Sequence, residues 1–250
     1  MRHLVIQIFS FLLLFHLAVS SQAETAAQLI RQAMDNYRGL SSYSEASMTI
    51  HRPDWERVMS MKVWTQGLDK SLVRITAPIK DKNGGSLLIG DNMWSYAPKI
   101  NRVIKIPSSM SNQSWMGSDF SNNDIARADE IINNYTHTLL ETKKINNRLT
   151  YIIQSVPNED APVVWGKEII TINDHYVLLK HEFYDQDNIL IKTLTASEIK
   201  KVGDKYISLK QRMQKTDHAN EWTEVVTTVV KFNVTFNKNT FTLSNLRNPR

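Results

Sequence analysis

Cysteine is missing from the 250-residue sequence. Its absence excludes disulfide frameworks, thiol catalysis, iron–sulfur clusters, cysteine-based zinc sites and any lipid anchor attached through a cysteine. Stray thiols are oxidised in a bacterial periplasm. A chain without cysteine therefore suits that compartment.

A strong charge of one sign is also missing. The chain has 30 Lys and Arg residues against 25 Asp and Glu residues, and its basic residues are scattered without a block of five or six. Nucleic-acid binding requires a concentrated basic surface. We therefore expect no nucleic-acid partner. With 42% hydrophobic residues, the composition is that of an ordinary globular protein.

Long hydrophobic runs are scarce as well. The longest extends from about Ile8 to Val19, follows Arg2, and precedes the small-x-small pattern Ser21-Gln22-Ala23. A membrane-spanning helix needs about 20 apolar residues, and polar residues interrupt this run. The pattern is typical of a secretory signal peptide. We expect residues 1–23 to be removed and residues 24–250 to form a single soluble periplasmic domain.

Hydrophobic periodicity predicts one helix followed by many strands. Over residues 24–37 the apolar side chains share one helical face, and Gly39 ends the helix. Beyond Gly39 the period changes to two, which indicates strands. Eleven strands are expected, at residues 59–64, 72–76, 86–89, 93–96, 102–106, 149–156, 167–173, 177–185, 189–199, 205–214 and 222–236. Short turns and the lack of crossover helices favour a large antiparallel meander.

Several of these strands are apolar on both faces. In residues 222–230 one face carries Trp222 and Val226, and the other carries Val225 and Val229. A sheet with one solvated face alternates more cleanly, so apolar material must cover each side. Two explanations stay open at this point. In the first, a helix packs on one face and a second sheet or a dimer partner covers the opposite face. In the second, the sheet borders an apolar cavity for a lipid.

Searches for catalytic and metal-binding motifs find none. His181-Glu182 lacks the second histidine of the zinc-hydrolase helix. No Gly-x-Ser-x-Gly nucleophile elbow exists, and Asn83-Gly84-Gly85 is too short to cradle a phosphate. We therefore expect no catalytic residue, no metal and no cofactor. A Ser-His-Asp set assembled from distant positions remains open, because such triads are recognised by geometry.

A long polar loop, residues 108–123, contains the large apolar side chains of Trp115, Met116 and Phe120. Such side chains either fold back as a hydrophobic plug or form a lid over a ligand. Residues 121–124 are expected to cap a short helix. Gly117 supplies a position that tolerates positive φ, and Asp119 is expected to bond backbone groups within the loop.

Three stretches between residues 93 and 124 carry a family resemblance. They are Met93-Trp94-Ser95-Tyr96-Ala97-Pro98, Arg102-Val103-Ile104-Lys105-Ile106-Pro107, and Ser114-Trp115-Met116-Gly117-Ser118-Asp119-Phe120-Ser121 with Asp124. They resemble the signature of the outer-membrane lipoprotein-sorting family, which comprises periplasmic proteins related to the carriers LolA and LolB. The resemblance extends loosely over the whole mature chain.

The resemblance implies a mainly β, strongly curved antiparallel half-barrel with helices packed in its concave face and a cavity for acyl chains between them. It therefore favours the cavity explanation of the two-sided apolarity. The residues expected to line the cavity or its lid are Met59, Met61, Val63, Trp94, Tyr96, Trp115, Met116 and Phe120. The residues expected to have structural roles in the signature are Pro98, Arg102, Gly117, Ser118 and Asp119.

The function implied is that of a soluble periplasmic carrier of a lipid or lipoprotein, without catalytic chemistry. Its expected partners are acyl chains, an inner-membrane exporter of the RND or ABC type, and an outer-membrane acceptor. A carrier predicts an almost wholly apolar cavity lining. Two alternatives remain. A secreted hydrolase of lipids or envelope glycans predicts converging polar side chains with perturbed pKa values, and a ligand-free adaptor of an export complex predicts no cavity.

Overall fold

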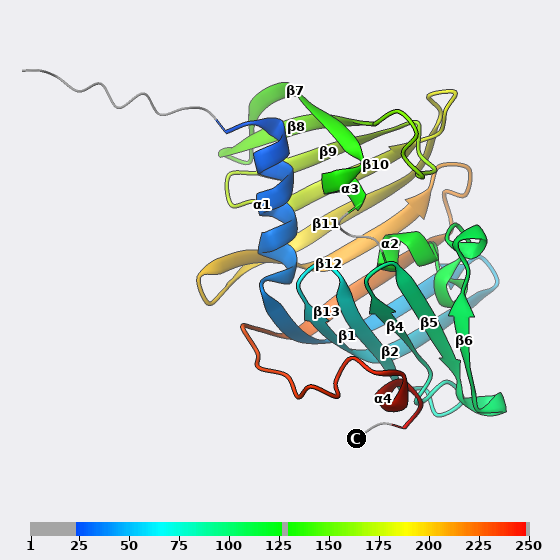
Figure 1. Ribbon diagram of the computed structural model, residues 1–250. Coiled ribbons are helices and arrows are strands. Elements are labelled where there is room, and N and C mark those ends of the chain that lie inside the picture. Colours follow the sequence, from blue (N-terminus) through cyan, green and yellow to red (C-terminus); the bar gives the residue numbers. More distant parts are fainter. Residues whose placement is uncertain (1–23, 127–129, 249–250) are drawn as a thin grey trace, which may run out of the picture.

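The computed structural model describes residues 24–126 and 130–248, which build one 13-stranded antiparallel sheet (Figure 1). The expected signal peptide, residues 1–23, lies outside the described residues. The strands are β1 (Ser41–Arg52), β2 (Trp55–Gln66), β3 (Lys70–Ala77), β4 (Gly85–Ile89), β5 (Asn92–Ala97), β6 (Arg102–Ile106), β7 (Tyr135–Ile145), β8 (Arg148–Pro157), β9 (Lys167–Asn173), β10 (Leu178–Tyr184), β11 (Leu190–Val202), β12 (Lys205–Lys215) and β13 (Trp222–Phe232). The antiparallel meander predicted from the sequence is confirmed.

The first helix also agrees with its prediction. Helix α1 (Ala26–Arg38) begins at Thr25, whose side chain forms a capping box with Gln28, and it ends at Gly39, where φ is 63°. Three short helices follow, α2 (Asn122–Ala126), α3 (Glu130–Asn133) and α4 (Leu243–Arg247), together with 3-10 turns at Pro98–Ile100, Ser108–Met110 and Trp115–Gly117. None of the helices in the described ranges is long and apolar enough to cross a membrane.

Pairing of β1 with β13 joins the two halves of the chain into one sheet. The spatial order is β6-β5-β4-β3-β2-β1-β13-β12-β11-β10-β9-β8-β7, so β6 and β7 form the two edges and do not pair with each other. The sheet is therefore open. The expected strong curvature of a half-barrel is wrong, because the sheet is neither closed nor strongly curled.

Two of the thirteen strands, β1 and β7, are not among the eleven predicted from the sequence. Strand β1 carries small or polar residues on both faces over its first half, such as Ser42, Tyr43, Ser44 and Glu45, so its period of two has little hydrophobic contrast. Strand β7 is an edge strand and is exposed along nearly its whole length. Hydrophobic alternation marks strands that bury one face, and an exposed edge strand buries little.

The sheet has an inner face, defined as the one that α1 covers, and an outer face. On the inner face, Leu29 and Ile30 of α1 pack against Ile153 and Ile170 of β8 and β9. Over β1 to β5 the same face is covered by the segment of residues 107–126, whose Trp115 is in one core cluster with residues of these strands.

The outer face of β3 to β5 has its own apolar cover. Leu246 of α4 packs there against Leu72, Leu87 and Tyr96. In this half of the sheet, therefore, the apolarity of both strand faces has two causes: the covering segment on the inner side and the C-terminal helix on the outer side. No second sheet is needed to explain it.

Candidate functional site

Two adjoining cavities lie between the inner face and the segments that cover it. Their volumes are about 210 Å³ and about 230 Å³, and they are called here the first and the second lobe. The lining residues that the two lobes have in common are Tyr37, Phe120, Asp124, Ile125, Ile207, Ser208 and Gln211. This shared wall makes them two lobes of one site.

The first lobe lies over β1, β2, β3 and β13. Ala46 stands opposite Met61 in the β1–β2 pairing, and Val63 stands opposite Val73 in the β2–β3 pairing, so these side chains form a continuous apolar floor. The alternation of the strand places Lys62 on the outer face, where its Nζ lies 3.9 Å from a carboxylate oxygen of Glu45.

The second lobe lies between α1 and strands β9 to β12. Ala33 and Met34 of α1 form one wall. Aromatic and aliphatic residues form much of the rest, with Trp165 packed against Phe183 at a centroid distance of 5.3 Å and Met213 close by. This part of the lining is apolar and suits a hydrocarbon chain.

A polar group interrupts the apolar lining of the second lobe. The Glu168 carboxylate contacts Nε2 of His181, and both residues line the lobe together with Tyr135. Burial, reinforced by the neighbouring Glu168, raises the pKa of the Tyr135 hydroxyl well above its ordinary value. The expectation of an almost wholly apolar lining is therefore wrong, because strands β9 and β10 point charged and hydrogen-bonding groups into the lobe.

A serine and a histidine lie next to this polar group. The hydroxyl of Ser155 lies 2.8 Å from Nδ1 of His137, and burial lowers the pKa of His137. Ser155 is fully buried and lies outside the lining of both lobes. A nucleophile must reach its substrate, so this pair has the geometry of a structural hydrogen bond.

A buried ion pair stands where the two lobes meet. Nζ of Lys192 on β11 lies 2.5 Å from Oδ2 of Asp124 in α2, and it also lies 4.8 Å from the ring centroid of Phe183. Both charged side chains are largely buried. The pair therefore ties α2 to the sheet and neutralises the one carboxylate that both lobes share. Within the described residues, no group of three or more His, Asp or Glu side chains is placed to hold a metal ion.

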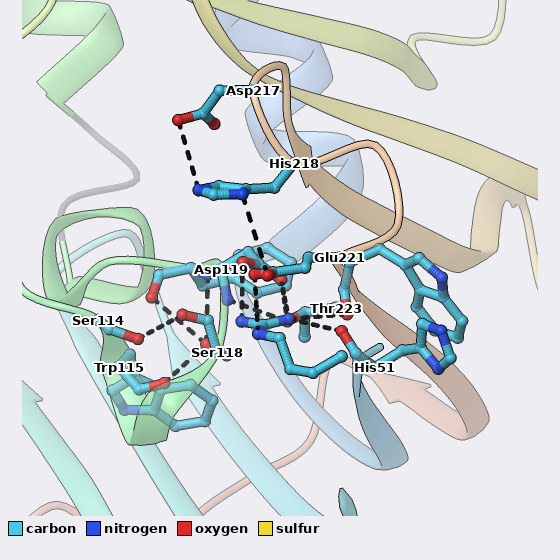
Figure 2. A network of polar contacts seen from close by, with 12 residues as sticks. His51, Ser114, Trp115, Ser118, Asp119, Asp217, His218, Glu221 and Thr223 are labelled. Carbon is cyan, nitrogen blue, oxygen red and sulfur yellow. Dashed lines mark hydrogen bonds and ion pairs between the residues drawn. The ribbon is translucent and has the colours of Figure 1, made fainter. Parts of the chain in front are cut away.

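The covering segment is fixed to the centre of the sheet through Asp119 (Figure 2). Its carboxylate accepts hydrogen bonds from Arg52 of β1, at 2.9 and 3.1 Å, and from the Thr223 hydroxyl of β13, at 2.7 Å. Arg52 also pairs with Glu221 at 3.2 Å. The expectation that Asp119 bonds backbone within its own loop is wrong, because the loop folds down until Asp119 meets strands that are distant in sequence.

Local contacts shape the rest of the segment. The Trp115 indole donates to the Ser86 hydroxyl at 3.0 Å, and the buried Ser118 hydroxyl donates to the Trp115 carbonyl at 2.6 Å. The positive φ expected at Gly117 is present, at 79°, and Met116 before it also has a positive φ of 53°. This tight turn directs Trp115 and Phe120 toward the sheet.

The structure places the predicted lining residues in three different environments. Met61, Val63, Trp115 and Phe120 line the lobes. Met59 is fully buried in the core beneath them, and Met116 packs against the same cluster. Trp94 and Tyr96 lie instead in the outer-face cluster with Leu246.

The remaining signature residues lie away from the cavity. Pro98 begins a 3-10 turn after β5, and Arg102 is the exposed first residue of β6. Other residues line the lobes without having been predicted from the sequence, among them Met48, Phe183, Leu194 and Met213. The last three lie in strands that were predicted from the sequence. Alternation shows which side chains of such a strand share a face, but it does not show which face borders a cavity.

An open antiparallel sheet with a helix and a long segment over a cavity on one face defines the class: the fold is LolA-like. It is similar to that of a putative outer membrane lipoprotein-sorting protein domain from Vibrio parahaemolyticus, with a TM-score of 0.77 and 22% identity, covering 89% of this chain and 98% of that one. A LolA superfamily protein from Nitrosomonas europaea is similar with a TM-score of 0.73 and 21% identity, and the match covers 88% of this chain and 98% of that one. A DUF1329 family protein from Desulfovibrio piger is similar with a TM-score of 0.81 and 23% identity, and the match covers 88% of this chain and 97% of that one.

Comparison by sequence gives the family. Residues 67–248 match the model of a family described as "Uncharacterized protein", and the chain belongs to that family. No curated protein matches the sequence. The matched residues include the covering segment and eleven of the strands, β3 to β13, in full.

Proposed function

We propose that this protein is a periplasmic carrier that binds the acyl chains of a lipid or lipoprotein in the two-lobed cavity. The observation that carries the proposal is the apolar floor of the first lobe beneath Trp115 and Phe120, continued by the aromatic wall of the second lobe. The LolA-like fold supports it. Two similar structures are those of a putative outer membrane lipoprotein-sorting protein domain and of a LolA superfamily protein.

The energetics of such a carrier are those of transfer between two apolar environments. Moving an acyl chain from a bilayer into the cavity is nearly neutral, whereas exposing it to water costs about 0.8 kcal/mol per CH₂. The carrier therefore lowers the barrier to crossing water but does not drive extraction from the bilayer. We propose that an inner-membrane exporter of the RND or ABC type loads it and that an outer-membrane acceptor receives the cargo.

The two alternatives have less support. A hydrolase would use the polar group around His181, but this histidine contacts Glu168, and the serine that bonds His137 is fully buried. A ligand-free adaptor would have no use for the lobes. The polar group of the second lobe is a feature that a hydrolase predicts, but Ser155, the serine next to this group, lies outside the lining of both lobes.

The test is mass spectrometry of organic extracts from protein purified without detergent. A matched pair of variants makes it specific. Val63→Trp fills the first lobe, and Lys62→Trp places the same side chain on the outer face of the same strand. We expect co-purifying acyl lipid with the wild type and with Lys62→Trp, and a strong reduction with Val63→Trp. Equal amounts of lipid from all three proteins, or none above a mock purification, would contradict the proposal.

A further inference from the structure

The first lobe has a polar end and an apolar end. At the polar end Ser42, Thr65 and Ser71 stand side by side across β1, β2 and β3, because Thr65 pairs with Ser42 on one side and with Ser71 on the other. Toward the other end the lining changes to Met48 and Trp115. A cavity with this gradient matches a molecule that has a polar head and a hydrocarbon tail.

Some of the hydroxyls that line this lobe have no protein partner. Ser42 and Thr65 bond each other at 2.6 Å. Among the described residues, the side chains of Ser44, Ser71 and Thr227 make no hydrogen bond to protein, although Ser71 is only 7% exposed. Ser44 and Thr227 are half-buried, and a few polar groups placed in an apolar pocket are what orients a ligand. These hydroxyls therefore offer donors and acceptors to a polar group inside the lobe.

Acidic side chains outnumber basic ones among the described residues that line the cavity: Asp124, Glu130 and Glu168 stand against Arg38. Arg38, at the polar end, donates from Nε and Nη2 to the carbonyls of Gly67 and Lys70, at 3.0 and 3.1 Å. The second lobe adds Glu130 and Glu168 to its wall. An anionic head in the second lobe would lose its hydration and meet like charges, and at the polar end of the first lobe the guanidinium of Arg38 is already bonded to backbone carbonyls.

From these observations we infer the class of cargo. We propose that the site binds an acyl lipid with a single chain and an uncharged, hydroxyl-bearing headgroup, of which a monoacylglycerol is the simplest example. The headgroup lies against Ser44, Ser71 and Thr227, and the chain runs toward Met48 and Trp115. Each lobe is smaller than the roughly 300–1,000 Å³ of common ligand pockets, which favours one chain. The inference rests on the proposed carrier function.

Two probes with the same acyl chain test the headgroup. Monooleoylglycerol and oleate are titrated against full-length mature protein loaded with an environment-sensitive fluorescent acyl probe, below the concentrations at which either lipid aggregates. Each hydrogen bond to the headgroup contributes about 0.5–1.5 kcal/mol. We expect monooleoylglycerol to displace the probe at a concentration about ten-fold lower than oleate.

Variants of the hydroxyls locate the headgroup. The triple variant Ser44→Ala, Ser71→Ala, Thr227→Val removes the three hydroxyls with little change of shape. The control variant Ser47→Ala, Thr49→Val makes the same kinds of change on the outer face of β1. We expect the triple variant to weaken monooleoylglycerol binding about ten-fold and to leave oleate unchanged, and the control to change neither. Thermal melts compare the folding of the two variants.

The outcomes separate the inference from the function on which it rests. If oleate displaces the probe as well as monooleoylglycerol does, or if the triple variant and the control bind monooleoylglycerol equally, the inference is wrong and the carrier proposal stands. If neither lipid displaces the probe and the probe itself does not bind, the carrier proposal fails and the inference fails with it.

Discussion

Asp119 and Arg52 form a buried ion pair, at 2.9 Å, that joins the segment covering the cavity to the central strand β1. The Asp119 side chain is 1% exposed, and the Thr223 hydroxyl supplies a further hydrogen bond. One acidic side chain thus holds the segment against two strands that themselves pair with each other. The position of this segment determines where the first lobe ends.

We expect Asp119→Asn to destabilise the protein by about 3 kcal/mol, because removing one partner leaves the other buried charge without compensation. Urea unfolding measures the change. The matched control is Asp217→Asn in the same network (Figure 2), since the Asp217 side chain is 74% exposed and its contact with His218 is 3.4 Å long. Exposed pairs contribute about 0–1 kcal/mol. Similar effects of both substitutions would show that the buried pair does not hold the segment.

Hydrogen exchange tests whether the covering segment is a mobile lid. The backbone N–H of Trp115 bonds the Phe120 carbonyl at 2.7 Å, and the N–H of Asp119 bonds the Thr223 hydroxyl at 2.9 Å. We therefore expect slow exchange at these two amides in delipidated protein, and faster exchange in Asp119→Asn. Fast exchange in the wild type that becomes slow on loading with lipid would instead support a lid.

The alternation of β2 predicts opposite effects of neighbouring substitutions on lipid binding. Met61→Asp places a charge in the floor of the first lobe, whereas Lys62→Asp changes the outer face. We expect titration with the fluorescent acyl probe to show a more than ten-fold loss of affinity for Met61→Asp and little change for Lys62→Asp. Because Met61 is buried, far-UV circular dichroism must confirm folding, and Val63→Trp provides a second variant without a buried charge. Equal losses in Met61→Asp and Lys62→Asp would refute the face assignment.

The buried His137 makes stability depend on pH. Burial lowers the pKa of its imidazole below the ordinary value of 6.5, so near and below that pH the unfolded chain binds more protons than the folded one. The contribution of His137 to stability is therefore complete at higher pH and decreases as the pH falls through 6.5. We expect urea unfolding to show a steeper loss of stability between pH 7.5 and 5.5 in the wild type than in His137→Asn. Parallel pH profiles of the two proteins would exclude this role.

How much of the fold was predictable depended on where each strand lies in the sheet. Strands that bury one face, such as β9 and β12, show clear alternation and were located to within a few residues. The edge strand β7 is exposed and was missed. The first half of β1 lines the polar end of the first lobe with Ser42 and Ser44. These serines make the inner face of the strand polar, so the hydrophobic alternation by which a strand is predicted is missing there.

The candidate site was predictable only in part. Met61, Val63, Trp115 and Phe120 were expected near a cavity and line it, while Trp94 and Tyr96 came from the same signature but lie on the outer face under α4. Alternation says that Trp94 and Met93 point to opposite sides. It does not say which side the covering segment occupies.

The sequence by itself determined a helix near residues 24–37, the run of antiparallel strands and the pair of apolar faces, because hydrophobic periodicity and a helix-ending glycine are local properties of the chain. Only the tertiary structure decided that β1 pairs with β13, that Asp119 bonds Thr223 across 104 residues of sequence, and that unpartnered hydroxyls meet at one end of the first lobe. These features depend on contacts between distant segments. Such contacts form only when the whole sheet has assembled, and no local pattern encodes them.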